Sequence, residues 1–298
     1  IHLVAMARAG GLILTLEDFG DLSKVAPLLT RIYPNGSADV NHFTAAGGTG
    51  YLIGQLLEAG LLHPDARTVT GSPLADHAKE PYLDGGELRF RAPPAASLDP
   101  TVLRPATNPF SADGGLKILD GNLGRAVIKI SAGAPDRRVV RAPALIFHAQ
   151  EEVEAAFKAG ELNRDFIAVV RFQGVRAIGM PELHKLTPIL ASVMAHGHQV
   201  ALVTDGRMSG ASGKVPAAIH LTPEAEAGGP IAKLREGDVI NLDAAAGTLM
   251  VEVSPEEFER REPATCDLEP YHYGYGRELF HTFRTVASGP EFGASSIS

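Results

Sequence analysis

The sequence predicts a mixed α/β chain in which a helical first part precedes a barrel-like β domain decorated with helices. Three observations support this class. Apolar residues recur at helical spacing in the first 80 residues, short apolar runs of strand length dominate the later part, and a Pro-rich stretch lies between them. Many short strands with only a few helices favour a closed or nearly closed barrel of mixed type.

Composition and charge exclude several classes of protein. Hydrophobic residues make up 45% of the 298 residues, which allows a sizeable core. Lys and Arg number 27 against 35 Asp and Glu, and this net charge of −8 argues against non-specific nucleic-acid binding, which needs clustered cations. No apolar run reaches about 18 residues, so no membrane span is expected. The single cysteine, Cys266, excludes a disulfide framework or a multi-thiolate site built by this chain alone, and it indicates a reducing, cytoplasmic compartment.

The first part of the chain is expected to contain two helices. Apolar residues repeat at helical spacing over 22–32, until a Pro-Asn-Gly sequence ends the run, and a second helix is expected over 51–60. The Pro-rich stretch 91–96 is the best linker candidate. We therefore expect one domain over 1–95 and a second over 96–298.

The second part is expected to be rich in strands. Strand-like runs occupy 116–119, 126–130, 139–146, 166–172 and 200–204, and 238–242 with 248–253 form an expected hairpin. Helices are expected over 151–159, 183–195 and 255–261.

The first segment with candidate chemistry follows the strand 166–172. A glycine-containing loop leads to Pro181, where a helix is expected to begin. Glu182 is then either a carboxylate that stabilises the positive end of the helix dipole or a ligand for Mg²⁺, which prefers oxygen ligands.

The second such segment follows the strand 200–204 and is rich in small residues. Ser209 is either an exposed nucleophile or base, or simply part of a Gly-Ser turn. The segment is not a Walker A motif, because Met208 and Val215 replace the first Gly and the final Ser or Thr. It is not a GxSxG elbow either, because Arg207 and Ala211 stand at the two glycine positions.

These segments together resemble the family of dihydroxyacid and phosphogluconate dehydratases. RFQGVRAIGMPELHKLTP (171–188) and TDGRMSGASGKVPAAIHLTPEA (204–225) carry most of the resemblance. IYPNGSADVNHFTAAGG, GGLKILDGNLGRAVIK and GRELF extend it from Ile1 to about Phe283. Gln173 stands where the dihydroxyacid branch usually carries Glu, which points to the phosphogluconate branch.

The resemblance implies a longer enzyme that removes water from an acid with hydroxyls at C2 and C3. In the family an N-terminal α/β domain supplies the cysteines of an iron–sulfur cluster and most Mg²⁺ ligands, and a C-terminal barrel closes over them. Residues 1–95 then correspond to the tail of the first domain and 96–298 to the barrel. Cys266 matches none of the cluster cysteines, so the cluster ligands are expected upstream and the isolated chain is expected to be inactive.

The resemblance also implies roles for individual residues. Ser209 matches the base that removes the C2 proton, and Glu182 matches a Mg²⁺ ligand. Ser212 is expected to orient the substrate carboxylate, while Lys214 and Lys185 are candidates for the phosphate, which suits their point charges. The expected reaction is dehydration of 6-phosphogluconate to 2-dehydro-3-deoxy-6-phosphogluconate in the Entner–Doudoroff pathway, by a homodimer. The alternatives are a dehydratase of a non-phosphorylated sugar acid or dihydroxyacid, and a non-catalytic barrel that only binds a ligand.

Overall fold

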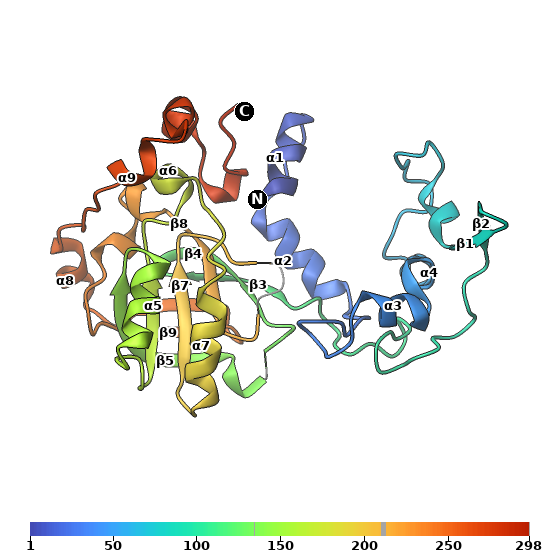
Figure 1. Ribbon diagram of the computed structural model, residues 1–298, viewed down its shortest axis with the longest axis horizontal. Helices are drawn as coiled ribbons and strands as arrows, with labels where there is room; N and C mark the ends of the chain where they lie inside the picture. Colours follow the sequence, from blue (N-terminus) through green and yellow to red (C-terminus); the bar gives the residue numbers. More distant parts are fainter. Residues whose placement is uncertain (134, 210–212, 298) are drawn as a thin grey trace. The chain divides into compact units, whose positions relative to one another are not determined.

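The computed structural model describes residues 1–133, 135–209 and 213–297 (Figure 1). The chain divides into two compact units. One unit contains Ile1–Gly20 and the chain from Leu116 onward, and the other contains Asp21–Gly115. The predicted boundary at residue 95 separates the N-terminal and C-terminal domains of the family, which are not the same as these compact units. This boundary stays a prediction.

The larger unit is built on a closed barrel. Its strands are β3 (Leu116–Gly121), β4 (Gly124–Lys129), β5 (Val139–Phe147), β6 (Phe166–Val170), β7 (Val200–Thr204), β8 (Ala217–Thr222), β9 (Val239–Asp243) and β10 (Thr248–Val251). They close in the order β10-β3-β4-β8-β7-β6-β5-β9. Neighbours from β5 through β8 pair parallel, and most other pairs are antiparallel. The prediction of a mixed α/β fold with a closed barrel is confirmed.

Alternation along the strands separates the interior of the barrel from its outer face. On β6, Ile167 and Val169 belong to the interior core, while Phe166 and Val170 belong to a second core outside the barrel. Successive side chains of a strand point to opposite faces, so one strand serves both cores. Helices α5 (Gln150–Lys158) and α7 (Leu186–Ala195) cover this outer face (Figure 1).

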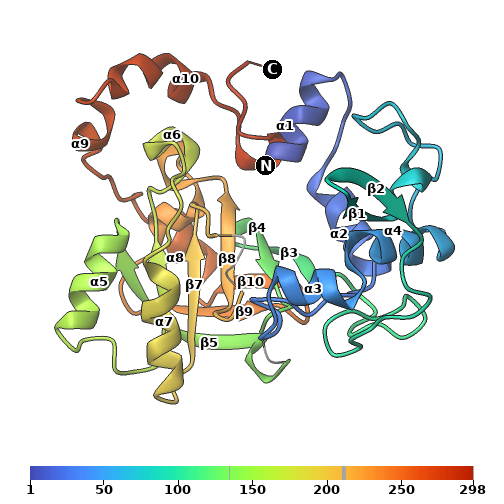
Figure 2. The same ribbon diagram turned by 45° about the vertical axis from the view of Figure 1, so that its right-hand side comes forward.

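Further helices decorate the same unit. They are α1 (His2–Ala9), α6 (Val175–Ile178), α8 (Pro255–Arg260), α9 (Glu269–His272) and α10 (His281–Val286). The C-terminal segment with α9 and α10 arches over α6 (Figure 2), and His272 Nε2 lies 2.6 Å from the carbonyl oxygen of Ala177. Within the described ranges, no helix combines the length and the apolar character needed to cross a membrane.

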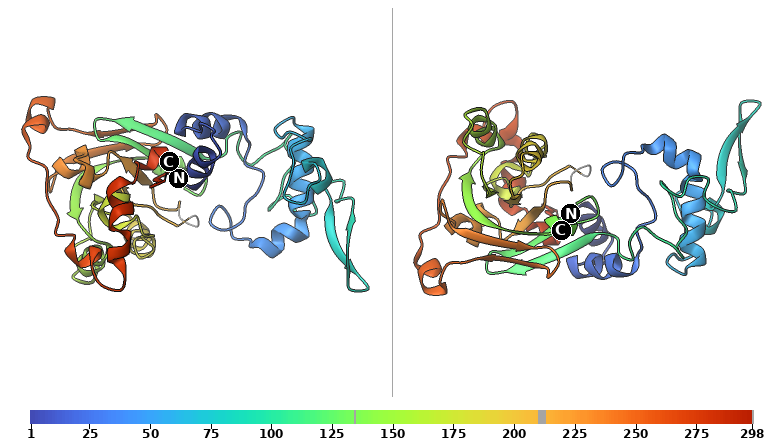
Figure 3. Two further views of the ribbon diagram at one scale, coloured as in Figure 1. Left: turned by 90° about the horizontal axis from the view of Figure 1, so that it is seen from above. Right: turned by 90° about the horizontal axis from the view of Figure 1, so that it is seen from below.

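The smaller unit has its own modest core and a separate two-stranded sheet. Helices α3 (Val40–Ala46) and α4 (Gly48–Glu58) contribute Ala46 and Tyr51 to this core. Strands β1 (Glu80–Asp84) and β2 (Glu87–Arg91) form an antiparallel hairpin, which is drawn in teal in Figure 3.

The first part of the chain differs from its prediction in two ways. The helix expected over 22–32 ends early, because α2 (Leu16–Val25) stops before Pro27. Proline lacks the N–H donor and disfavours the helical conformation of the residue before it. The β1–β2 hairpin was not predicted, although Gly85 and Gly86 between strand-like residues indicate a tight turn; both glycines have positive φ.

Candidate active site

Three parallel strands end at the same end of the barrel and place the candidate loops side by side. β6, β7 and β8 are neighbours, and Val170 pairs with Thr204 at the ends of β6 and β7. The loops that leave them therefore start level with each other. We call residues 171–185 the glutamate loop and residues 205–216 the serine loop.

The glutamate loop pairs directly with the serine loop. Glu182 forms an isolated parallel bridge with Arg207, the Leu183 N–H donates to the carbonyl of Arg207 at 3.0 Å, and Arg207 Nε donates to the carbonyl of Met180 at 3.0 Å. Arg207 Nη1 also lies 3.6 Å from Glu182 Oε2. The expected helix over 183–195 is present as α7, but its expected start near Pro181 is wrong: α7 begins at Leu186, and the Leu183 N–H before it bonds to the serine loop.

Ser209 stands close to this bridge. It follows Arg207 by two residues, which span at most about 7 Å of chain. Its side chain is half-buried, and the preceding Met208 is buried in the outer core. The structure therefore brings the predicted base and the predicted metal ligand, Glu182, onto adjacent segments.

The other predicted site residues are placed less favourably or lie outside the described residues. Ser212 is one of the residues outside the described ranges, and Lys214 is exposed on the serine loop. Lys185 Nζ lies 3.2 Å from a Glu151 carboxylate oxygen and 3.4 Å from one of Glu154, both on α5. These carboxylates, Glu151 first, raise the pKa of Lys185. A substrate phosphate would have to compete with them.

Two buried carboxylates next to these loops were not singled out from the sequence. Asp205 follows β7 and is completely buried, and Glu224 follows β8 and is 3% exposed. Both residues stand inside the family-like segment 204–225, but nothing in their spacing shows that their partners are backbone N–H groups of other loops. The hydrogen-bond partners of these two carboxylates are seen only in the three-dimensional structure.

Glu224 fixes the start of α6. Its two carboxylate oxygens accept from the Arg176 N–H at 3.0 and 3.2 Å. Gly174 leaves the space for this carboxylate, since a Cβ on Gly174 would lie 1.6 Å from Glu224 Oε2. Burial is the main cause that raises the pKa of Glu224, and the negative charge of Asp205 also raises it, while the Arg176 N–H and guanidinium lower it; together these effects bring the pKa to about 7.

This pKa predicts that stability falls as pH rises. Between the ordinary value of 4.5 and about 7, the folded protein holds the Glu224 proton more tightly than the unfolded chain does. The free energy of unfolding should lose roughly 3 kcal/mol over that window. Glu224→Gln should flatten this part of the pH profile of the melting temperature in the full-length protein. Glu226→Gln, at an exposed neighbouring carboxylate, is the control, and equal profiles for the two variants and the wild type would contradict the prediction.

Two further titratable side chains border the serine loop. Burial, assisted by the positive charge of Arg207 and of the N-terminal residues, lowers the pKa of His220 to about 4, so its imidazole is neutral at neutral pH. Burial also lowers the pKa of Lys129. The Lys129 side chain packs against Gly213, where a Cβ would lie 3.2 Å from its Cδ.

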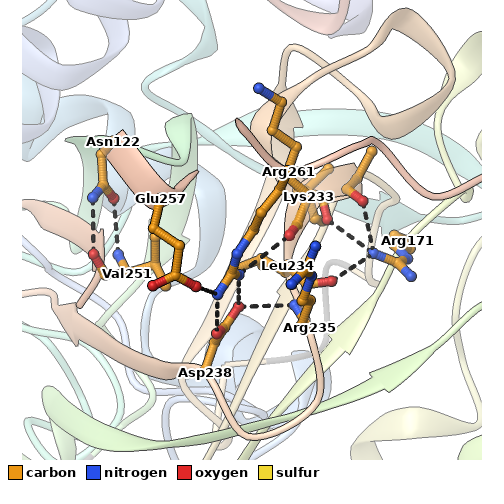
Figure 4. A network of polar contacts seen from close by, with 11 residues as sticks. Asn122, Arg171, Lys233, Leu234, Arg235, Asp238, Val251, Glu257 and Arg261 are labelled. Atoms are coloured by element: carbon orange, nitrogen blue, oxygen red, sulfur yellow. Dashed lines mark hydrogen bonds and ion pairs between the residues drawn. The ribbon is translucent and has the colours of Figure 1, made fainter. Parts of the chain in front are cut away.

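Two buried polar residues at the start of the glutamate loop donate hydrogen bonds to backbone carbonyls. Arg171 donates through Nη1 to the carbonyls of Ala232 and Leu234, each at 3.0 Å (Figure 4). Gln173 donates through Nε2 to the carbonyls of His148 and Phe172, at 2.6 and 3.1 Å. Gln173, the residue that pointed to the phosphogluconate branch, therefore serves the internal scaffold.

The residues that the structure describes were compared with the needs of a bound metal ion. Among the described residues there is no group of three or more His, Cys, Asp or Glu side chains placed to hold a metal ion. Glu182 does present a single, partly exposed carboxylate on the loop edge. That fits Mg²⁺, which is often bound by one or two carboxylates together with substrate and water.

The amino-acid sequence matches a known family of proteins. The sequence model described as Dihydroxy-acid/6-phosphogluconate dehydratase C-terminal matches residues 101–294, and the corresponding N-terminal model matches residues 1–77. The chain belongs to the dihydroxy-acid/6-phosphogluconate dehydratase family. Both loops of the candidate site lie inside the C-terminal match.

The identity to individual members of the family differs from one member to another. The chain is 56% identical over 300 residues to the phosphogluconate dehydratase of Pseudomonas aeruginosa and 52% identical over 298 residues to that of Escherichia coli K12. Each alignment covers all of this chain but 49% of the relative, so the chain spans about half the length of these relatives. The dihydroxy-acid dehydratase of Pyrobaculum calidifontis is 37% identical over 262 residues, which cover 88% of this chain and 44% of the relative.

Proposed function

We propose that the protein containing this chain is a hydro-lyase that converts 6-phosphogluconate to 2-dehydro-3-deoxy-6-phosphogluconate, as in the Entner–Doudoroff pathway. The observation that carries the proposal is the contrast between relatives. Identity is 56% to a phosphogluconate dehydratase over the whole chain, against 37% to a dihydroxy-acid dehydratase over 88% of it.

In this proposal Ser209 is the base of the reaction. Its Oγ takes the proton from C2, the electron pair of that C–H bond forms the C2–C3 double bond, and the C3 hydroxyl leaves. The proton and the hydroxyl together make the released water. The enol that remains moves its C2 hydroxyl proton to C3 and becomes the 2-keto acid.

Glu182 is the residue that we assign to a bound Mg²⁺ in this proposal. A neutral serine hydroxyl is too weak a base to take this proton, so Ser209 would act as its alkoxide, which positive charge or metal coordination in its surroundings stabilises. A divalent ion supplies such charge, and it polarises a substrate carboxylate. The Glu182–Arg207 bridge supports the assignment, because it keeps this carboxylate beside the segment that leads to Ser209.

An iron–sulfur cluster, which the family resemblance implies, does not fit the residues of this chain. The cluster is held by several thiolates, and the sequence contains one cysteine. That cysteine, Cys266, is a half-buried free thiol. We therefore assign the cluster ligands to residues outside this chain and derive no step through the cluster.

Substrate recognition, assembly and location complete the proposal. We assign Lys214 to the substrate phosphate and Ser212 to the substrate carboxylate; Lys185 is the weaker phosphate candidate, because it already pairs with α5. We further propose a cytoplasmic homodimer.

A comparison of substrates tests the proposal. The full-length protein should be assayed with 6-phosphogluconate, gluconate and 2,3-dihydroxyisovalerate. Because a site built for a charged group leaves its own charges unpaired with an analogue that lacks it, kcat/KM should be about 10²-fold or more higher for 6-phosphogluconate. A preference for either of the other acids would favour the alternative dehydratases, and no turnover of any of them would favour a ligand-binding barrel.

A further inference from the structure

The carboxylate of Asp205 joins all three loops at the edge of the barrel that carries the candidate site. Its Oδ1 accepts from the Gln173 N–H at 2.9 Å. Its Oδ2 accepts from the Phe172 N–H at 3.2 Å and from the Ala225 N–H at 2.9 Å. These donors belong to the loops that follow β6 and β8, while Asp205 itself opens the loop that follows β7.

The chain between Asp205 and Ser209 is held on both sides. The carbonyl of Gly206 accepts from the His220 N–H on β8 at 2.9 Å, and the carbonyl of Arg207 accepts from the Leu183 N–H at 3.0 Å. The serine loop therefore holds the glutamate loop at two places, through Asp205 at its beginning and through Arg207 beside Glu182.

The surroundings of Asp205 are closely packed, so the backbone N–H groups that it accepts from could not easily turn to water instead. Asp205 is completely buried, and Phe172 is held at a φ of +62°, which side chains rarely adopt. A Cβ on Gly206 would lie 2.7 Å from the Cβ of Gln173, so the two loops are already in close contact. A backbone N–H that lost its acceptor here would be cut off from water, which costs free energy comparable to a lost hydrogen bond.

We propose that Asp205 is a positioning residue for the dehydration, whose carboxylate fixes the distance between Ser209 and Glu182 by joining the three loops. The proposal rests on the function proposed above for those two residues. Asp205 does not act on the substrate. It acts through the loop geometry, and misplacement of a reacting group by about 1 Å can cost about 10²-fold in rate.

The test is Asp205→Asn in the full-length protein. The amide keeps the size of the side chain but replaces one acceptor oxygen with an N–H₂ group, which faces a backbone N–H and breaks at least one of the three bonds. We expect kcat for 6-phosphogluconate to fall roughly 10- to 100-fold, while KM changes by less than about threefold. Hydrogen exchange should speed up together at residues 172, 173 and 225.

Asp238→Asn is the matched control. Asp238 is also nearly buried, and it accepts from the Arg235 N–H at 2.8 Å and from Arg261 Nη2 at 3.0 Å (Figure 4). This variant makes the same chemical change on the turn before β9, away from the three loops. It should lower the melting temperature but leave kcat within about twofold of the wild type.

Each outcome decides the proposal. A folded Asp205→Asn protein with wild-type kcat would overturn it, and so would an equal loss of kcat in Asp238→Asn. If Asp205→Asn does not fold, wild-type hydrogen exchange at low urea concentrations takes its place: the amides of Phe172, Gln173 and Ala225 should open as one unit, and independent opening would overturn the proposal. Failure of the wild type to turn over 6-phosphogluconate would instead reject the proposed function, while the exchange measurement would still test the joining of the loops.

Discussion

Replacing Ser209 with alanine in the full-length protein should lower kcat for 6-phosphogluconate by about 10²- to 10⁴-fold, the usual contribution of a general base. The physical reason is that Ser209 stands two residues from the Glu182–Arg207 bridge, at the meeting point of the two candidate loops. The alanine removes only a hydroxyl from a half-buried side chain, so the fold and the bound metal should be retained.

The control for this prediction is Ser192→Ala. Ser192 is also half-buried, but it lies on α7, which covers the outer face of the barrel. Both variants should show the wild-type circular dichroism spectrum and metal content, and only Ser209→Ala should lose turnover. Activity within a few-fold of the wild type in Ser209→Ala would remove this residue from the mechanism.

The second large effect is expected for Glu182→Gln. The amide has nearly the same shape but no charge, and it is a poorer ligand for a hard cation such as Mg²⁺. The Mg²⁺ concentration that gives half-maximal activity should therefore rise by at least about 10-fold. Direct Mn²⁺ binding, followed by electron paramagnetic resonance, should weaken in parallel.

Loss of the ion pair between Glu182 and Arg207 would not account for a weaker response to Mg²⁺. Both side chains are 39% exposed, and exposed ion pairs contribute about 0–1 kcal/mol. The melting temperature should hence change little. Glu256→Gln, in the first turn of α8, is the control for removal of one acidic side chain. A Mg²⁺ titration that is unchanged in Glu182→Gln would argue against the ligand role.

The barrel was predictable because its signals are local. Runs such as Phe166–Val170 and Val200–Thr204 are apolar throughout and of strand length, which is typical of parallel strands buried on both faces. The end of α2 was readable in principle from Pro27. The start of α7 was not, since Glu182 is drawn into pairing with Arg207, a residue 25 positions later in the chain.

The candidate site was predictable only where a residue type itself suggests chemistry. Ser209 and Glu182 lie in glycine-containing loops that follow buried strands, and their expected roles came from the family resemblance. Asp205 and Glu224 did not stand out, because their partners are backbone N–H groups at positions 172, 173, 176 and 225. Backbone groups have no signature in a sequence, so carboxylates that organise loops are found only once the loops are placed in space.

An isotope experiment on the full-length protein asks whether Ser209 removes the C2 proton of the substrate. The full-length wild type and Ser209→Ala should be given 6-phosphogluconate deuterated at C2, and the release of deuterium to water should be followed with product formation. We expect the wild type to release deuterium as it forms product, and we expect Ser209→Ala to release deuterium and form product far more slowly. If Ser209→Ala released deuterium within a few-fold of the wild-type rate, Ser209 would not be the base.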